Sequence, residues 1–161
     1  MVSVYRDMSL LIIRDDMQLP CWVELSQVLG EYRVLLQGAE IQATASGYDY
    51  EEALDGLRET LESQGVFLLC NRFRRNAMVT SMCRQMSDGL ACYLVKPFKA
   101  VGPEYVVESL GSAPAQDVCS IAESESYLRK FKGWFALPWP LRHQVRLWRT
   151  VTPWGSIQLR D

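Results

Sequence analysis

Arginines and cysteines gather in one short segment, CNRFRRNAMVTSMCRQM, residues 70–86. Guanidinium groups beside an aromatic ring are suited to phosphate contact and base stacking, so this segment is a candidate nucleic-acid site. Its nucleic-acid-binding residues would be Arg72, Arg74, Arg75 and Arg84. The structural alternative is that these arginines pair with an acidic helix that precedes them and cap a sheet edge. Residue types alone do not decide between the two.

The same segment offers two thiols, Cys70 and Cys83, as candidate nucleophiles. A catalytic cysteine needs a base nearby and a lowered pKa, which neighbouring arginines can help to provide. However, Cys70 ends an apolar run and should be buried, and His143 is the only histidine. No phosphate loop or dinucleotide-binding glycine pattern is present either. We therefore assign no catalytic residue and expect a protein that is not an enzyme, with a Cys70 or Cys83 enzyme as the least supported alternative.

The cysteines do not form the closely spaced pairs that structural zinc usually requires. All five stand far apart: Cys21, Cys70, Cys83, Cys92 and Cys119. We interpret them as reduced, mostly buried small apolar residues, as in a cytoplasmic protein. We expect no metal and no cofactor, and we interpret the methionines Met78, Met82 and Met86 as core filler.

Charge is divided unevenly along the chain. Residues 1–66 carry a net charge of −8 and the remainder +6, which gives −2 for all 161 residues. Such a chain can present a charged face to a partner, or its two halves can interleave and cancel. This total net charge gives no overall signal for nucleic-acid or membrane binding. No apolar run is long enough for a membrane span, and the N-terminal residues do not form a secretory signal.

Strand patterns dominate the first 46 residues. Short apolar or alternating runs occupy residues 9–14, 22–28, 31–37 and 40–46. Asp15-Asp16 and Pro20 should break the first run, and Leu29-Gly30 marks a hairpin turn. These patterns predict an antiparallel meander.

A helix is predicted for residues 49–64. Asp49 and Glu52 have the spacing of a capping box, and Gly65 is a stop signal. One side should be apolar, formed by Tyr50, Ala53, Leu54, Leu57 and Leu61. The continuous apolar run that follows, residues 66–70, is typical of a central strand.

The rest of the chain alternates between shorter elements. A short helix capped by Thr80 and ended by Gly89 should lead to a strand at residues 91–98. After a loop-rich stretch, Ser120 and Glu123 form a second capping box and predict a helix over residues 120–135, with Tyr127, Leu128, Phe131, Trp134 and Phe135 as its apolar stripe. The tail, residues 136–161, is rich in Trp, Pro and Arg, and residues 143–151 suit a strand. We predict a single α+β domain, an antiparallel sheet with a few helices packed on it.

Part of this chain resembles a group of small bacterial proteins. The resemblance rests on an apolar strand and on residues in and after its end, which here are Cys70, Asn71, Arg75, Ser81, Met82, Arg84, Met86, Gly89 and Tyr93. A later helix, SYLRKFKGWF at residues 126–135, is also similar. The group is associated with the immunity proteins of polymorphic toxins and contact-dependent growth inhibition. The similarity covers residues 49–135, and the tail departs from it.

The resemblance implies a cytoplasmic antitoxin that binds a cognate toxin domain, and the toxin is expected to be a nuclease. Nucleases that bind polyanions are typically basic, so an acidic surface would cover the toxin's active site and speed the encounter. The partner-binding residues would be Asp15, Asp16, Glu51, Glu52, Asp55, Glu59 and Glu62. The alternative function is an RNA- or nucleotide-binding module that uses the arginines of residues 72–84. The sequence leaves open the oligomeric state and the role of the tail.

Overall fold

Four antiparallel strands joined by two-residue turns form the first 47 residues. They are β1 (Val2–Arg14), β2 (Met17–Val28), β3 (Glu31–Gly38) and β4 (Ile41–Gly47). The computed structural model describes residues 2–136, with side chains described for residues 6–133. The predicted meander is confirmed, and β1 is longer than its apolar run indicated because polar residues extend it along β2.

All three turns place both central residues in the left-handed backbone region. The φ values are 51° and 61° for Asp15 and Asp16, 52° and 86° for Leu29 and Gly30, and 49° and 61° for Ala39 and Glu40. This is the conformation of type I′ turns, whose twist matches that of antiparallel strands. Only one of the six residues is glycine, so only Leu29-Gly30 carried a clear turn signal in the sequence.

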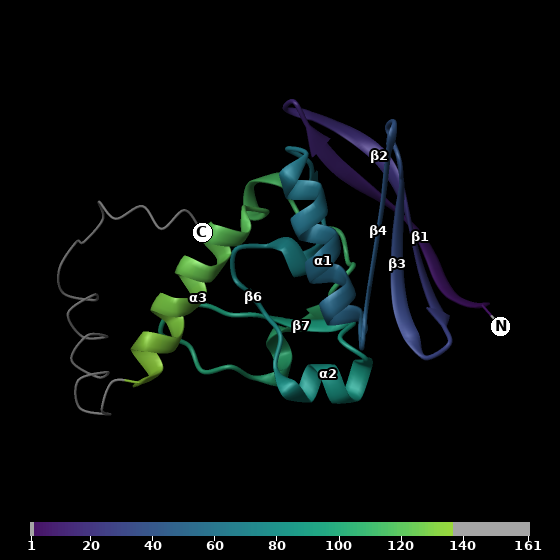
Figure 1. Ribbon diagram of the computed structural model, residues 1–161. Helices are drawn as coiled ribbons and strands as arrows, with labels where there is room; N and C mark the ends of the chain where they lie inside the picture. The colour runs from purple at the N-terminus through teal and green to yellow at the C-terminus, as the bar shows by residue number, and fades with distance from the viewer. Residues whose placement is uncertain (1, 137–161) are drawn as a thin grey trace.

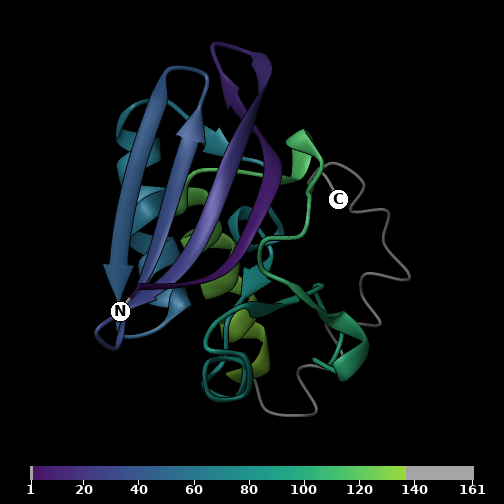
Figure 2. The same cartoon turned by 90° about the vertical axis from the view of Figure 1, so that its right-hand side faces the viewer.

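The two faces of this sheet have different environments. Alternate residues such as Ile12, Val23 and Leu36 point inward and are fully buried. Their neighbours Leu11 and Trp22 point outward and are exposed. When the outer face of the sheet is viewed, α1 lies behind it (Figure 2). The core therefore lies between the inner face and the helices.

The run at residues 9–14 ends at Asp15 and Asp16, as predicted, but Pro20 lies inside β2 and not at a break between strands. Its register partner is Leu11 on β1, while β3 pairs with β2 only from Trp22 onward. The proline therefore lies in a part of the strand with a neighbour on one side only. A missing N–H is tolerated there because no ladder bond is lost on the open side.

The first helix, α1 (Tyr50–Ser63), packs against the inner face of the sheet (Figure 1). The Asp49 side chain caps it by accepting a hydrogen bond from the Glu52 N–H at 2.9 Å. The predicted apolar stripe is confirmed, since Leu54, Leu57 and Leu61 are almost completely buried. Truncating any of these leucines to alanine would cost about 2–5 kcal/mol.

The apolar run after α1 is not a central strand. Only β5 (Phe67–Leu68) pairs, and it lies at the edge of the five-stranded sheet β4-β3-β2-β1-β5. The rest of the run lies between β1 and a later loop. The Leu69 N–H donates to the Leu11 carbonyl, and the Leu69 carbonyl accepts from the Ala113 N–H. Cys70 forms an isolated β-bridge with Ser112. The following loops cover these residues, so they are apolar without having a strand on both sides.

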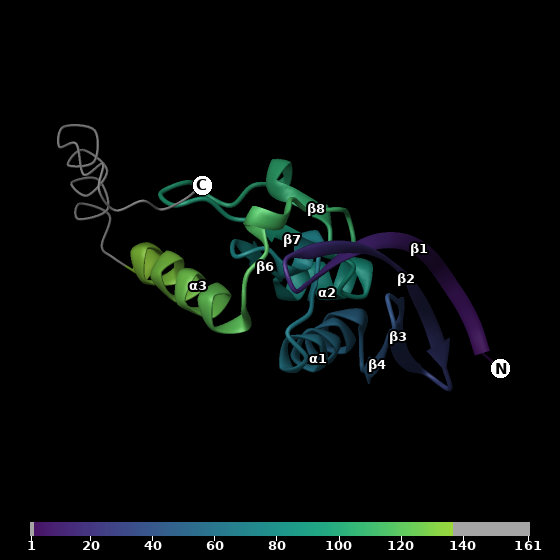
Figure 3. The ribbon, with the colours of Figure 1, turned by 90° about the horizontal axis from the view of Figure 1, so that it is seen from above.

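A second, smaller sheet and two helices complete the described chain. The strands β6 (Ala77–Met78), β7 (Ala91–Leu94) and β8 (Val106–Glu108) form it in that order, with α2 (Ser81–Ser87) between β6 and β7. Three short 3-10 turns, η1 (Asn71–Phe73), η2 (Pro103–Tyr105) and η3 (Ala115–Asp117), join these elements. Viewed from above, the meander lies at one side of the molecule and α3 (Ile121–Ala136) at the other (Figure 3).

The caps predicted for α2 and α3 are confirmed. The Thr80 hydroxyl accepts from the Cys83 N–H, and the helix α2 ends at Asp88 and Gly89, both at positive φ. Ser120 and Glu123 bond reciprocally at the start of α3. Of its predicted apolar stripe, Phe131 is buried and Tyr127 and Leu128 are half-buried.

The α+β prediction is confirmed. The strand proposed for residues 143–151, like the other features of the tail, lies outside the described residues. None of the described helices is long and apolar enough to cross a membrane.

Candidate functional site

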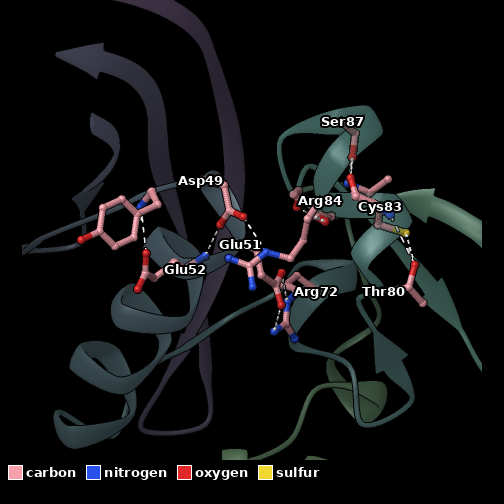
Figure 4. A network of polar contacts seen from close by, with 12 residues as sticks. Asp49, Glu51, Glu52, Arg72, Thr80, Cys83, Arg84 and Ser87 are labelled. Carbon is pink, nitrogen blue, oxygen red and sulfur yellow. Dashed lines mark hydrogen bonds and ion pairs between the residues drawn. The ribbon is translucent and has the colours of Figure 1, made fainter. Parts of the chain in front are cut away.

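The centre of the arginine segment is an ion pair inside the protein. Arg72 is buried, and its guanidinium donates two hydrogen bonds to the Glu51 carboxylate, at 2.8 Å from Nε and 2.6 Å from Nη2 (Figure 4). It also reaches Asp55 at 2.6 Å. Although burial works against the charged form, these two carboxylates raise the pKa of Arg72. The Arg72 guanidinium therefore binds two carboxylates of α1.

The helix α2 carries a second arginine that reaches α1. Arg84 donates to Asp49 at 2.6 Å, so Asp49 both caps α1 and holds α2 (Figure 4). The Tyr50 N–H donates to the Asp88 carbonyl at 2.8 Å. Gly89 allows this close approach, because a Cβ there would lie 2.4 Å from the Glu51 nitrogen.

Arg58, on α1 itself, is a second buried guanidinium. It donates to the carbonyls of Phe73 and Cys119, at 3.3 and 2.8 Å, and lies over the Phe73 ring. Burial and the nearby charge of Arg72 lower its pKa. These contacts join α1 to η1 and to the segment before α3, so Arg58 helps to hold these parts of the fold together.

The two remaining arginines of the segment, Arg74 and Arg75, contact residues that do not belong to α1. Arg74 forms an ion pair with Asp117 at 2.6 Å, and its Nε is buried without a hydrogen-bond partner among the described residues. The Arg75 guanidinium lies 5.9 Å from the centre of the Tyr127 ring. All four arginines predicted as nucleic-acid ligands are thus held in contacts within the chain. The structural alternative holds for Arg72 and Arg84, which pair with the acidic helix.

The predicted acidic surface divides between the two sides of α1. Glu51 is buried beneath Arg72 and does not belong to the surface. Glu52 and Glu59 are exposed, Asp55 is half-exposed beside Arg72, and Glu62 is partly buried. Glu52 accepts a hydrogen bond from the Tyr48 N–H, and Glu62 accepts one from the Ile121 N–H.

The three exposed carboxylates and the partly buried Glu62 form a line, which we name the acidic stripe: Glu52, Asp55, Glu59 and Glu62. Their spacing of three, four and three residues places them along one side of the helix. Within the described chain, only Asp55 of the four forms an ion pair. Like charges at this spacing repel one another, so the stripe lowers the stability of the helix slightly while providing a concentrated negative potential.

Asp15 and Asp16, the other predicted partner-binding residues, lie at the exposed tip of the β1–β2 hairpin. The residue pair Ile13 and Phe67 joins the base of this tip to the chain just after α1. The tip therefore lies at the same end of the molecule as the C-terminus of α1 (Figure 1). Arg14 forms an ion pair with Asp15 at 3.8 Å, which offsets part of the negative charge of the tip.

The two candidate nucleophiles are in the interior. Burial raises the pKa of the Cys70 thiol to about 12, which leaves almost no thiolate near neutral pH. Cys83 lies on the buried side of α2, with its sulfur 3.4 Å from the Thr80 hydroxyl. The prediction of mostly buried cysteines is confirmed, because only Cys119 is partly exposed. His143 lies outside the described residues.

Two methionines contradict the prediction that they fill the core. Met82 and Met86 are 59% and 80% exposed and lie one turn apart on the outer side of α2. The helix instead buries Cys83. Met78 is partly buried in β6, so the prediction is wrong for the two helical residues only.

The described part of the chain contains no group of three or more His, Cys, Asp or Glu side chains placed to hold a metal ion. No protein-family model and no curated protein sequence matches this chain. Its function must therefore be inferred from the geometry of its own surfaces.

Proposed function

We propose that this protein is an immunity protein, an antitoxin that binds a basic bacterial toxin domain and covers its active site. The observation that carries the proposal is the acidic stripe on α1. Three of its four carboxylates have no cationic partner among the described residues, although the chain places arginines close by. Those arginines pair with Glu51, Asp49 and, within the stripe, Asp55. Glu52, Glu59 and Glu62 form no ion pair in the described chain.

Charge complementarity gives this surface a clear type of partner. A row of carboxylates attracts a protein that carries Lys and Arg around a polyanion-binding site. Opposite potentials raise the association rate and disfavour acidic competitors. A nuclease domain fits this description because its active site must attract a phosphate backbone. Binding there would exclude the nucleic acid by charge and by volume.

The rigidity of the stripe also supports an inhibitory role. Its helix is fixed on the other side by fully buried leucines and by the Arg72 and Arg58 contacts. A partner therefore meets carboxylates whose backbone positions are already set, and binding does not have to order the helix first. No comparable observation favours the nucleic-acid alternative, because its four arginines are engaged within the chain.

The test begins with the full chain, tagged and expressed in its native bacterium. It is recovered at low and high salt, and the eluate is examined by mass spectrometry and nucleic-acid staining. We expect a stoichiometric protein partner. The captured toxin domain is then co-expressed with the antitoxin in a growth assay, in which the wild-type chain restores growth.

The decisive variant is Glu52→Lys with Glu59→Lys, since both side chains are exposed. We expect it to weaken toxin binding by at least about tenfold, or roughly 1.4 kcal/mol. A matched control, Glu104→Lys with Glu125→Lys, makes the same change in net charge at exposed positions away from the stripe. The proposal fails if the stripe variant protects as well as the wild type, or if both variants lose the same affinity. A salt-sensitive RNA signal without a protein partner would favour the nucleic-acid alternative.

A further inference from the structure

The strand β4 is an edge of the larger sheet that carries none of the usual protection. Its sequence, IQATASG, contains no charged residue and no proline, and its seven residues pair with β3 along their whole length without a bulge. Proteins usually protect such an edge with lysine, proline or a bulge, because the unpaired groups attract other strands. Among the described residues, nothing pairs with the outer side of β4, so this edge can accept one more strand.

The turn geometry identifies the backbone groups that are available. In a two-residue hairpin, the pair next to the turn is hydrogen bonded, which here is Gly38 with Ile41. Bonded and non-bonded pairs then alternate along the ladder. The N–H and C=O groups of Gln42, Thr44 and Ser46 consequently point away from β3. No other backbone in the described residues bonds to them.

One side of an added strand would meet α1. The helix lies directly along β4: a Cβ on Gly56 would be 3.4 Å from the Ala45 Cβ, and one on Gly47 would be 2.7 Å from the Glu52 Cβ. Gly56 and Thr60, both partly exposed, border the space beside the strand. The exposed carboxylates Glu52 and Glu59 lie on the adjoining part of the helix surface. The residues of α1 beside the open edge are thus either small or acidic.

We propose that the β4 edge binds an extended strand of a partner protein that carries Lys or Arg at alternate positions. Backbone bonds to Gln42, Thr44 and Ser46 hold the strand, and its alternate side chains point over Gly56 and Thr60 toward Glu52 and Glu59. Strand addition of this kind obtains affinity from the main chain and specificity from every second side chain. This inference rests on the proposed function, since it describes how the basic partner docks.

A second copy of this chain is a poorer occupant. Antiparallel pairing of two β4 strands about a two-fold axis keeps both α1 helices on the same face of the joined sheet. Each helix lies over β4 at the junction, so the two acidic stripes would approach each other. Like charges brought together in this way oppose association. The charge of the surface therefore favours a basic partner over self-association.

The test uses the ¹⁵N-labelled full chain and three blocked seven-residue peptides. The first peptide alternates lysine and valine, the second alternates glutamate and valine, and the third is the lysine peptide with alternate backbone amides methylated. Amide chemical shifts report where each peptide binds. We expect the lysine peptide to shift the amides of Gln42, Thr44 and Ser46, and the other two to bind at least about tenfold more weakly.

Matched variants separate backbone pairing from simple attraction. Thr44→Pro removes an outward-pointing N–H at an edge where proline is tolerated, while Thr44→Ala keeps that N–H. Thermal unfolding first confirms that both variants fold. We expect Thr44→Pro to lower the affinity for the lysine peptide about tenfold and Thr44→Ala to leave it within about twofold.

Three results would overturn the inference. The methylated peptide could bind as tightly as the lysine peptide, the shifts could fall away from β4, or the outward amides of β4 could resist hydrogen exchange in the protein alone. The last result would mean that this chain's own residues, or a second copy, already occupy the edge. Any of these would leave the proposed function standing if the Glu52→Lys, Glu59→Lys variant still loses its toxin. If that variant keeps its toxin, the proposed function fails independently.

Discussion

The two sides of α1 use the same type of residue in opposite ways. On the inner side, Glu51 is buried and accepts two hydrogen bonds from Arg72. On the outer side, Glu52 and Glu59 are exposed and have no cationic partner in the described chain. Glu51 and Glu52 are adjacent in the sequence, yet the helix turns them about 100° apart. The same side-chain chemistry therefore fixes the fold at one position and provides a surface at the next.

This difference also shows how the acidic and basic halves of the chain meet. The basic segment after α1 returns to that helix and neutralises its inner and end carboxylates through Arg72 and Arg84. Arg6 and Glu108 form a further pair in the opposite sense, from the meander to β8. The two halves thus interleave at these ion pairs. Glu52 and Glu59 form no such pair within the described chain.

The largest expected effect comes from removing the inner cation. Arg72→Met leaves Glu51 buried without its partner, and we expect the free energy of unfolding to fall by about 3–5 kcal/mol. Urea denaturation at neutral pH measures it. Arg72→Met with Glu51→Met removes both charges and should recover most of the loss. A loss below about 1 kcal/mol for the single variant would contradict the buried-pair interpretation.

The second largest effect is expected at Gly89, where the turn after α2 lies close to the start of α1. Gly89 has a φ of +85°, and a Cβ there would lie 2.4 Å from the Glu51 nitrogen. We expect Gly89→Ala to cost about 2–4 kcal/mol through backbone strain and this clash. Gly65→Ala is the control, because Gly65 has a φ of +69° but nothing within 4 Å of the added Cβ. It should cost only about 1 kcal/mol. Equal losses would show that the close approach contributes nothing.

On the outer side the expected change in stability is small. Glu59→Gln removes one charge of the acidic stripe, and Glu59 forms no hydrogen bond or ion pair with the residues that the structure describes. The free energy of unfolding should therefore change by less than about 0.5 kcal/mol. Glu51→Gln, measured by the same urea titration, should lose several times more because it weakens the pair with Arg72. Similar losses for both variants would remove the distinction between the two sides of α1.

The smallest effect concerns a carboxylate that is exposed yet hydrogen bonded. The backbone N–H and hydroxyl of Ser120 donate to Glu123 and lower its pKa below the usual value of 4.5. Its contribution to stability is therefore present above pH 4.5 and is lost as the pH falls through the lowered pKa. Carboxyl NMR titration measures this shift. Ser120→Ala removes the hydroxyl but keeps the backbone N–H, so it should return the pKa only part of the way toward 4.5. An unchanged pKa in that variant would show that the hydroxyl does not contribute to the shift.

Local signals in the sequence predicted the helices well. The capping residues Asp49, Thr80 and Ser120 each lie three residues before the group they bond, so the interaction is encoded within one turn. The alternation of residues 40–46 likewise specified which side of β4 is buried. These predictions succeeded because the responsible contacts are between neighbours in the chain.

Features that depend on distant contacts could not be predicted in this way. Periodicity showed that residues 66–70 are buried but not that loops, rather than strands, cover them. Met82 and Met86 have helical spacing, which does not say whether that side of α2 faces the core. Glu51 could be recognised as buried only after Arg72, 21 residues later, was placed beside it. The open β4 edge was missed because strand order across the sheet is not a local property.

The three consecutive two-residue turns have a consequence for the order of folding. Every pairing within the meander joins neighbouring segments, whereas β5 pairs with β1 across more than 50 residues. Short loops close at a lower entropic cost, so we expect the meander to form first. Pulsed hydrogen exchange would show this as earlier protection of β2 and β3 amides than of Leu68 and Leu69, and simultaneous protection would exclude it.

During synthesis, the apolar inner face of that meander would stay exposed to solvent until α1 has been made. The helix follows directly in the chain, and its last residue, Ser63, is 16 positions after the end of β4. A ribosome adds that many residues in roughly 1–3 s. The position of the helix in the sequence therefore keeps the time in which an apolar sheet could aggregate to a few seconds.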